Sequence, residues 1–186
     1  ALLVFDEVQT GFYGSGKPWF WQHTTTHPDI VSFGKKTQTC GIYANDRIDE
    51  IEENVFNRSS RINSTWGGNL VDMVRCTKFI EIIERDRIAD QVTSVGEFVV
   101  EGLRDIARES DVFTSIRGKG SLIAFTMPSE QHRKAMLRSL MDAYVIALPC
   151  GTQSVRFRLP LIMTIEEAGE LLNRVKEAIQ SMQVVV

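Results

Sequence analysis

Two short apolar runs near the start of the chain each end in charged or flexible residues. The first, residues 2–5, is followed by Asp6, and the second, residues 30–33, is followed by Gly34 and Lys35. Runs of this length and composition are typical of strands in a parallel sheet, and the carboxyl ends of such strands carry the ligand-binding residues of open α/β proteins. The sequence therefore predicts an α/β fold in which Asp6 and Lys35 lie at one edge of a buried sheet.

The apolar pattern changes after residue 70, where apolar residues recur every three or four positions. This period predicts helices near residues 70–83, 88–106, 130–144 and 165–179. Extended apolar runs predict further strands at residues 41–44, 112–116, 121–127, 145–148 and 154–157. We expect two domains, a partial α/β layer in residues 1–70 and an α+β domain in residues 71–186. Among the helix residues, we expect Leu70, Val74 and Met141 to face the core and Thr164 with Glu167 to form a capping box.

The composition excludes several classes of protein. The chain has 186 residues, a net charge of −3, 43% apolar and 24% charged residues, which is ordinary for a globular protein. It lacks the excess of positive charge that nucleic-acid binding requires, and its apolar runs are far shorter than the ~20 residues of a membrane helix. Cys40, Cys76 and Cys150 are an odd number and lie far apart. This favours a reducing compartment, and we expect a cytoplasmic protein with neither nucleic acid nor membrane as partner.

A glycine-rich segment nearly matches the phosphate-binding P-loop. Gly11, Gly16 and Lys17 have the required spacing, but Pro18 stands where a Ser or Thr hydroxyl must reach magnesium. The preceding acidic strand also runs directly into the segment, whereas P-loop enzymes take these two parts from different strands. A plain turn is therefore the favoured interpretation, and a P-loop NTPase is a weak alternative.

Asp6 and Lys35 have a chemical use beyond that of surface charge. Lysine is mostly exposed in proteins, so a solvated side chain is one interpretation of Lys35. The other is a reactive amine paired with Asp6, because a buried lysine has a lowered pKa and can form a Schiff base with a carbonyl group. Spacing alone leaves both interpretations open.

Four sequence blocks resemble the class III (ω-) aminotransferases, which are fold-type I enzymes that use pyridoxal 5′-phosphate. In chain order, the blocks are residues 3–11, 28–36, 61–69 and 154–160. The resemblance implies a partial large-domain sheet that binds the cofactor, followed by a small C-terminal α+β domain. It also implies amine and 2-oxo acid substrates and a homodimer with a shared active site. Blocks 35–41 and 61–69 are most similar to the branch that transfers the ε-amino group of L-lysine to 2-oxoglutarate, with ornithine or 4-aminobutyrate as alternative donors.

By position, the resemblance assigns four residues to the cofactor ring. Lys35 corresponds to the lysine that forms the Schiff base and then moves a proton as general base and acid. Asp6 corresponds to the partner of the protonated ring nitrogen, which makes the ring an electron sink. Val8 would pack on the ring face, with plain core packing as its alternative, and Gln9 would hydrogen-bond the ring's phenolic oxygen. Lys36 receives no role.

Three further residues are assigned to the cofactor phosphate and the substrate. Thr65 corresponds to the threonine that binds cofactor phosphate from the neighbouring subunit, with a helix cap as the alternative. Asn63 is placed near the substrate or the same phosphate. Arg156 corresponds to the arginine that binds a substrate carboxylate through two parallel hydrogen bonds. Arg158, two residues further along the strand, either assists it or is a surface charge, and Glu7 has no assigned part.

The chain begins inside an apolar run and without an initiator methionine. The blocks that the family carries before the first strand, including its phosphate loop, are not in this sequence. We therefore expect a C-terminal portion of a longer enzyme, with an apolar strand edge that favours self-association.

Overall fold

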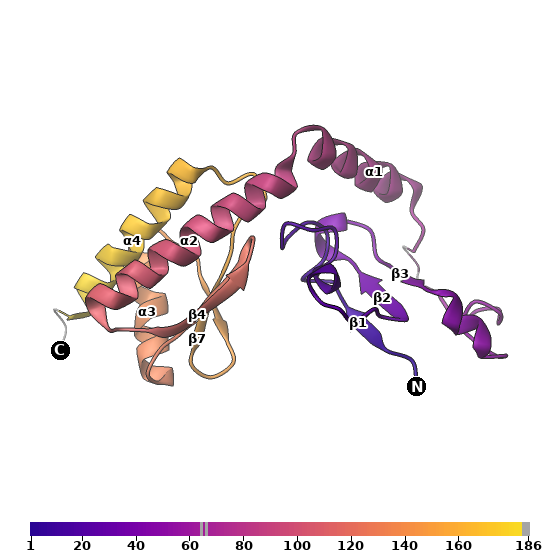
Figure 1. Cartoon of the computed structure of the whole chain (residues 1–186), viewed down its shortest axis with the longest axis horizontal. Helices are drawn as coiled ribbons and strands as arrows, with labels where there is room; N and C mark the ends of the chain where they lie inside the picture. Colours follow the sequence, from indigo (N-terminus) through magenta and orange to yellow (C-terminus); the bar gives the residue numbers. More distant parts are fainter. Residues whose placement is uncertain (64, 66, 184–186) are drawn as a thin grey trace. The chain divides into compact units, whose positions relative to one another are not determined.

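The computed structural model describes residues 1–63, 65 and 67–183 (Figure 1). The chain divides into two compact units, Ala1–Arg87 and a second that begins at Ile88. The sequence places a domain boundary at residue 70, and the first compact unit extends to Arg87, so the helix between these positions belongs to it.

The first unit contains a three-stranded sheet in the order β1-β2-β3. Its strands are β1 (Val4–Asp6), β2 (Ile30–Phe33) and β3 (Gly41–Ala44). β1 and β2 run parallel with Asp6 opposite Ser32, and β3 is antiparallel to β2. The parallel pair places the carboxyl ends of β1 and β2 at the same edge, as the sequence predicts.

β1 is more exposed than the sequence predicts. Val31 in β2 is 1% exposed, whereas Leu3 is 39% and Val4 is 57% exposed. The prediction of a buried strand at residues 2–5 is therefore wrong within this unit. The physical reason is that β1 lies at the edge of the sheet, with β2 as its one neighbour among the described strands.

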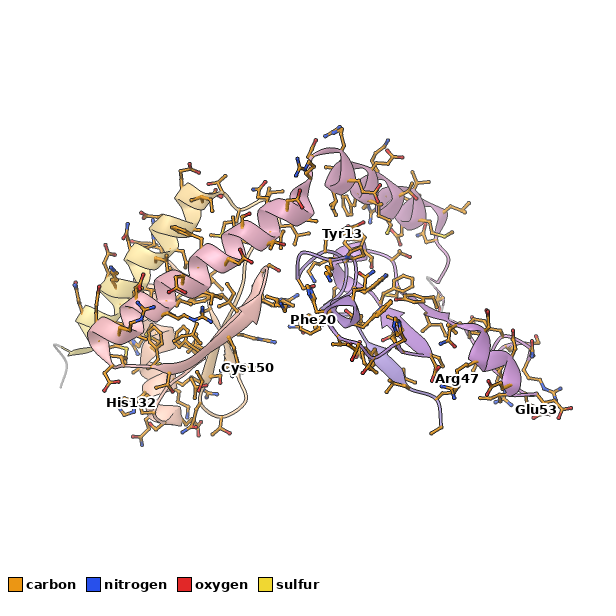
Figure 2. All side chains as sticks on the ribbon, in the orientation of Figure 1. Tyr13, Phe20, Arg47, Glu53, His132 and Cys150 are labelled. Atoms are coloured by element: carbon orange, nitrogen blue, oxygen red, sulfur yellow. The ribbon has the colours of Figure 1, made fainter. Side chains whose placement is uncertain are left out.

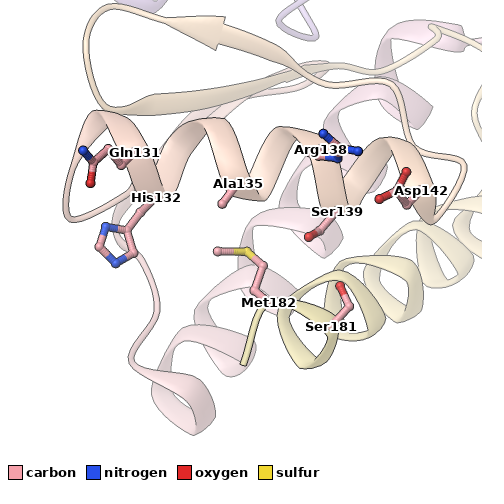
Figure 3. Close-up of a pocket in the computed structure, with 8 residues that line it drawn as sticks. All are labelled: Gln131, His132, Ala135, Arg138, Ser139, Asp142, Ser181 and Met182. Atoms are coloured by element: carbon pink, nitrogen blue, oxygen red, sulfur yellow. The ribbon is translucent and has the colours of Figure 1, made fainter. Parts of the chain in front are cut away.

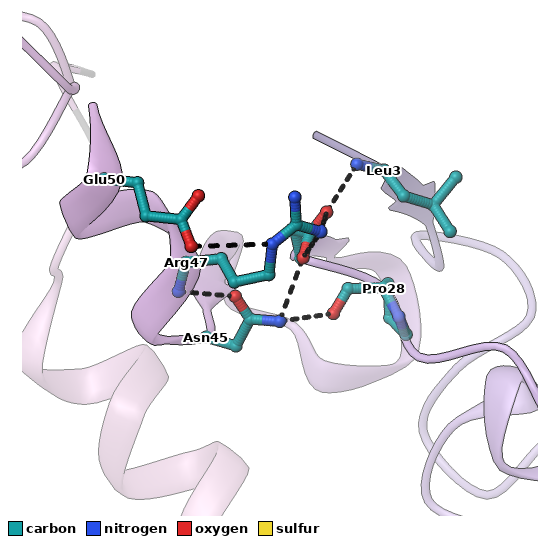
Figure 4. A network of polar contacts seen from close by, with 6 residues as sticks. Leu3, Pro28, Asn45, Arg47 and Glu50 are labelled. Carbon is teal, nitrogen blue, oxygen red and sulfur yellow. Dashed lines mark hydrogen bonds and ion pairs between the residues drawn. The ribbon is translucent and has the colours of Figure 1, made fainter. Parts of the chain in front are cut away.

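A buried carboxylate joins the amino ends of β1 and β2 (Figure 4). Asp29 is 3% exposed and accepts hydrogen bonds from the Leu3 backbone N–H at 2.8 Å and the Asn45 side-chain amide at 3.1 Å. The Arg47 guanidinium lies 3.0 Å from both of its oxygens. The bonds from Leu3 and Asn45, together with the Arg47 charge, hold the pKa of Asp29 below its usual range. This network fixes the register of the two strands at the edge opposite Asp6.

The described residues of the first unit also form four helical segments. They are the 3₁₀ helices η1 (Phe20–His23), η2 (Lys35–Thr37) and η3 (Asp46–Glu50) and the α-helix α1 (Leu70–Arg85). Asn69 caps α1, because its side-chain oxygen accepts the Val71 backbone N–H at 3.0 Å. Leu70 and Val74 are 74% and 69% exposed, so the prediction that they face a core is wrong in this unit. Ile83 is the buried residue of this helix.

The second unit is a four-stranded antiparallel sheet in the order β4-β5-β7-β6, with three helices on one face (Figure 1). The strands are β4 (Thr114–Lys119), β5 (Leu122–Thr126), β6 (Leu148–Cys150) and β7 (Ser154–Arg158). The helices are α2 (Ile88–Ser110), α3 (Glu130–Asp142) and α4 (Ile165–Gln183). Alternate residues of β5 and β7 enter the core, where Phe125 and Val155 are fully buried beside Leu103 of α2 and Val175 of α4.

The capping box of α4 is present as predicted. The Glu167 N–H donates to the Thr164 hydroxyl at 3.2 Å, and the Thr164 N–H donates to the Glu167 carboxylate at 2.8 Å. The core face of α4 includes buried apolar residues: Ala168, Leu171, Leu172, Val175 and Ile179.

Two predictions for this unit are wrong. Met141 is 56% exposed, although Met136 and Leu140 on the same helix are fully buried. β6 begins at Leu148 rather than at Val145. The Val145 N–H donates to the Leu140 carbonyl at 2.7 Å, and Tyr144 has a φ of +60°. Residues 144 and 145 thus complete the end of α3, and the extended segment starts after them.

Candidate functional site

Asp6 ends β1 with its carboxylate held in place on one side. Its Oδ1 accepts the Val8 backbone N–H at 3.0 Å and the Ser32 hydroxyl at 3.1 Å. The Val8 bond, then the Ser32 bond, and the charge of Lys35 hold the pKa of Asp6 below its usual range. The carboxyl group therefore stays ionised near neutral pH. Because the side chain is exposed, it can accept a further hydrogen bond from a ligand.

Lys35 follows β2 at the same edge of the sheet. Its Nζ lies 3.4 Å from Gln9 Oε1, and its side chain is exposed. Lys35 has a φ of +54°, in the left-handed region that non-glycine residues rarely occupy. Strained backbone of this kind concentrates at functional sites. Asp6, Gln9 and Lys35 thus form one cluster, which we name the Asp6–Lys35 cluster.

Val8 belongs to the same edge and lies against the backbone of Gly34. A Cβ built on Gly34 would lie 3.5 Å from Val8 Cγ1 and 3.1 Å from the Cys40 sulfur. A side chain at Gly34 would therefore crowd the Cys40 sulfur and would be in ordinary contact with Val8. The half-buried Val8 side chain covers the turn between β2 and Lys35.

The two adjacent lysines have different environments. Lys36 is partly buried, and its Nζ donates to the Gln9 carbonyl at 2.7 Å and to the Gly11 carbonyl at 3.0 Å. Lys36 is therefore engaged with the loop after β1, while the exposed Lys35 amine lies beside the Gln9 side chain. This difference supports the choice of Lys35 as the reactive amine.

Glu7, to which the sequence assigns no part, organises the loop beside the cluster. It is 3% exposed and accepts the Phe20 N–H at 2.9 Å, the Trp21 N–H at 2.7 Å and the Thr10 hydroxyl at 2.8 Å. Phe20, labelled in Figure 2, is the first residue of η1. Trp21 in turn donates its indole N–H to the Tyr43 hydroxyl at 3.1 Å. The carboxylate thus holds η1 against the end of β1.

Ser32, Lys36 and Glu7 also contribute to the site, and their contributions were not predicted from the sequence. A hydroxyl inside the otherwise apolar strand 30–33 is the one local signal for Ser32. The contacts of Glu7 and Lys36 with backbone groups join positions 13 to 27 residues apart, and nothing in their own segments indicates them.

The glycine-rich segment is a compact loop that lacks the architecture of a P-loop. The Gly11 N–H donates to the Glu7 carbonyl at 2.9 Å, and the Phe12 N–H donates to the Pro18 carbonyl at 2.7 Å. Lys17 Nζ donates to the Gln22 carbonyl at 2.9 Å. The loop leads into the four-residue η1 instead of the long α-helix whose N-terminus would bind phosphate, so the NTPase alternative is wrong.

Asn63 and Thr65 are exposed, in a block whose residues 64 and 66 lie outside the described part of the chain. Within that described part, no contact joins Asn63 or Thr65 to the Asp6–Lys35 cluster. The helix-cap interpretation of Thr65 is wrong, because Asn69 provides the cap of α1. The assignment of Thr65 to a phosphate remains a prediction.

Arg156 lies in the second unit, on the face of the sheet opposite the core. It is partly buried, and its Nε has no hydrogen-bond partner within the described residues. Strand register places Arg156, Arg158, Arg117 and Lys119 on this same face, with Ala124 between Arg117 and Arg156. We name it the cationic face. The four strands that form it contain no acidic residue.

A pocket of about 480 Å³ lies between α3 and the end of α4 (Figure 3). Its lining includes His132, Arg138, Asp142 and Met182. His132 Nδ1 lies 2.8 Å from the Ser129 hydroxyl, next to the start of α3. The pocket contains none of the site residues that the sequence predicts.

The chemistry of the Asp6–Lys35 cluster fits pyridoxal phosphate. The aldehyde of that cofactor requires a primary amine, which Lys35 offers, and its ring nitrogen requires an ionised acceptor, which Asp6 offers. The Gln9 oxygen faces Lys35, which leaves its NH₂ group to donate to a ring oxygen. Within the described residues, no group of three His, Cys, Asp or Glu side chains could hold a metal ion, and no helix could cross a membrane.

Comparison with known proteins identifies the family. Residues 1–179 match the model of the class-III aminotransferases, and the chain belongs to this family. Over 183 residues it is 46% identical to the L-lysine-epsilon aminotransferase of Amycolatopsis lactamdurans, covering 97% of this chain and 41% of that protein. It is 32% identical over 183 residues to the 4-aminobutyrate aminotransferase of Dictyostelium discoideum, covering 97% of this chain and 36% of that protein.

The fold agrees with this assignment. The structure matches the lysine aminotransferase from M. tuberculosis in the internal aldimine form with a TM-score of 0.92 and 41% identity, covering 98% of this chain and 42% of that one. The predicted family and the fold-type I class are therefore confirmed. The chain spans about two fifths of the length of these relatives.

Proposed function

We propose that the chain provides the reactive lysine and the ring-nitrogen aspartate of a lysine ε-aminotransferase. The reaction would transfer the ε-amino group of L-lysine to 2-oxoglutarate, with pyridoxal phosphate as the cofactor. The observation that carries the proposal is the convergence of Asp6, Gln9 and Lys35 at one sheet edge. The identity of 46% to a lysine enzyme, against 32% to a 4-aminobutyrate enzyme, supports lysine as the donor.

The cofactor, when bound, supplies a carbonyl carbon for the amine and an electron sink for the carbanion that follows proton removal. Lys35 Nζ is the amine that would hold the cofactor, and the substrate amine would replace it there. As a free amine, Lys35 Nζ then takes the proton from the ε-carbon of the substrate and later returns a proton. Asp6 would accept a hydrogen bond from the protonated ring nitrogen, Gln9 would donate to the phenolic oxygen, and Val8 would pack on the ring.

The remaining assignments complete the proposal. Arg156 would bind a substrate carboxylate, for which its unpartnered Nε and the surrounding cationic face are suited. Thr65 and Asn63 would reach the cofactor phosphate or the substrate across a homodimer interface. The first unit would then be part of the cofactor-binding domain, the second unit the small domain, and the enzyme cytoplasmic.

The test is to identify the amine that reacts. The chain is incubated with pyridoxal phosphate, reduced with borohydride and digested, and the modified peptide is mapped. We expect modification of Lys35, its loss in Lys35→Met and its retention in Lys36→Met. Modification of Lys36 with Lys35 unmodified would overturn the assignment. In the enzyme that contains this chain, faster amino transfer from ornithine or 4-aminobutyrate than from lysine would overturn the assignment of lysine as the amino donor.

A further inference from the structure

The segments that follow β1 and β2 carry the proposed site, and hydrogen bonds from Lys36 join them. The strand ladder ends where the Glu7 N–H donates to the Ser32 carbonyl at 2.9 Å. Beyond this bond the first segment continues as residues 8–11, and the second as Gly34 and η2. Lys36, within η2, reaches across to the Gln9 and Gly11 carbonyls at 2.7 and 3.0 Å.

Both lysines of the pair thus converge on Gln9 from different sides. Lys36 holds the Gln9 backbone carbonyl, and Lys35 lies 3.4 Å from the Gln9 side-chain oxygen. We propose that Lys36 is a positioning residue of this site, which fixes Gln9 so that its amide lies beside Lys35 and meets the ring oxygen of the cofactor. The contact with the cofactor rests on the proposed function. The role of Lys36 in holding Gln9 in place concerns the chain alone.

The chemistry of the contact requires an ammonium group. Its three N–H donors on a flexible four-carbon chain can satisfy two carbonyl oxygens at once. Methionine has similar length but no donor, so Lys36→Met leaves two partly buried carbonyls without this partner and releases residues 9–11. Arginine keeps the charge and several donors, so Lys36→Arg should restore much of the contact.

The chain offers a matched control in Lys17. Its Nζ also donates to a backbone carbonyl, that of Gln22 at 2.9 Å, but this bond is exposed and does not involve Gln9. Lys17→Met therefore removes a charge and a lysine–carbonyl bond of the same kind from the same unit. Its effects measure what such a loss does when Gln9 keeps its partner.

The experiment compares the full chain with Lys36→Met, Lys36→Arg and Lys17→Met in three measurements. The first is hydrogen–deuterium exchange of residues 8–11 without cofactor, the second is the dissociation constant of pyridoxal phosphate, and the third is the pH midpoint of the bound cofactor's visible absorbance. In Lys36→Met we expect faster exchange, about tenfold weaker binding and a midpoint raised by about one unit, because a hydrogen bond to the ring oxyanion is lost. Lys36→Arg should recover most of these values, and Lys17→Met should keep all three.

Each outcome decides the inference. Faster exchange in Lys36→Met with unchanged affinity and pH midpoint would mean that Lys36 only stabilises the loop, and the positioning role would be overturned. If the unmodified chain takes up no cofactor, the proposed function of this chain fails. The exchange data then test only whether Lys36 holds residues 9–11 in place. Unchanged exchange at residues 8–11 in Lys36→Met would then overturn that role as well.

Discussion

Replacing Glu7 with alanine tests how the loop beside the site is held. The Glu7 carboxylate is 3% exposed and accepts two backbone N–H groups, those of Phe20 and Trp21, and the Thr10 hydroxyl. Alanine leaves both N–H groups without this acceptor in a poorly hydrated place. At about 1–3 kcal/mol for each buried donor left unsatisfied, the free energy of unfolding of the first unit should fall by about 2–6 kcal/mol.

Urea unfolding followed by tryptophan fluorescence measures this loss, and hydrogen–deuterium exchange of residues 18–23 locates it. Glu52→Ala is the matched control because Glu52 is exposed, and it should change the free energy of unfolding by no more than about 0.5 kcal/mol. Glu7→Gln keeps one carbonyl oxygen and should lose less than Glu7→Ala. The reasoning is refuted if Glu7→Ala matches the control and the exchange of residues 18–23 is unchanged.

Three further predictions concern packing, acid stability and the cofactor. A Cβ on Gly96 of α2 would lie 2.3 Å from the Gly120 carbonyl oxygen, so Gly96→Ala should lower the free energy of unfolding by about 1–3 kcal/mol. A Cβ on Gly169 would meet nothing within 4 Å, so Gly169→Ala should raise the free energy of unfolding by up to about 1 kcal/mol. Thermal melting measures both changes. The pKa of Asp29 is lowered in the folded chain, so its contribution is full above its unfolded pKa of about 4 and is lost as pH falls through the folded value. Urea unfolding from pH 2 to 7 should therefore show Asp29→Asn less stable than the parent at neutral pH and the two converging in acid; parallel curves would contradict this. In the enzyme that contains this chain, Thr65→Ala should weaken cofactor binding by about 10–150-fold with an unchanged apo melting temperature, and unchanged affinity in equilibrium dialysis would exclude a phosphate contact.

The local parts of the fold follow from the sequence. Strands at residues 30–33 and 41–44 and the break between α1 and α2 agree with their apolar patterns, because period and turn residues are properties of a short segment. The carboxyl ends of β1 and β2 meet for the same reason, since parallel pairing fixes which ends are neighbours.

Exposure and long-range polar contacts do not follow from pattern alone. Leu70, Val74 and Met141 fit helical stripes and are exposed, because a stripe shows which side of a helix is apolar without showing what covers it. Glu7 and Lys36 are charged residues next to the predicted site. Their partners are backbone groups brought close by the tertiary fold, and no side-chain pattern encodes these groups.

The cationic face has a consequence for how the chain behaves in solution. The net charge of −3 describes the whole chain, but the strands of the second unit present two arginines, Arg156 and Arg158, beside Arg117 and Lys119, with no acid among them. Arg156 and Arg158 stand two residues apart on β7, as Arg117 and Lys119 do on β4. Two residues span about 7 Å along a strand, inside the screening length of about 8 Å at physiological ionic strength, so the charges of each pair reinforce one another. The chain should bind to cation-exchange media more strongly than its isoelectric point of about 5.7 suggests. Phosphate and sulfate buffers should also compete with carboxylate ligands, so affinities for such ligands are best measured in chloride at fixed ionic strength.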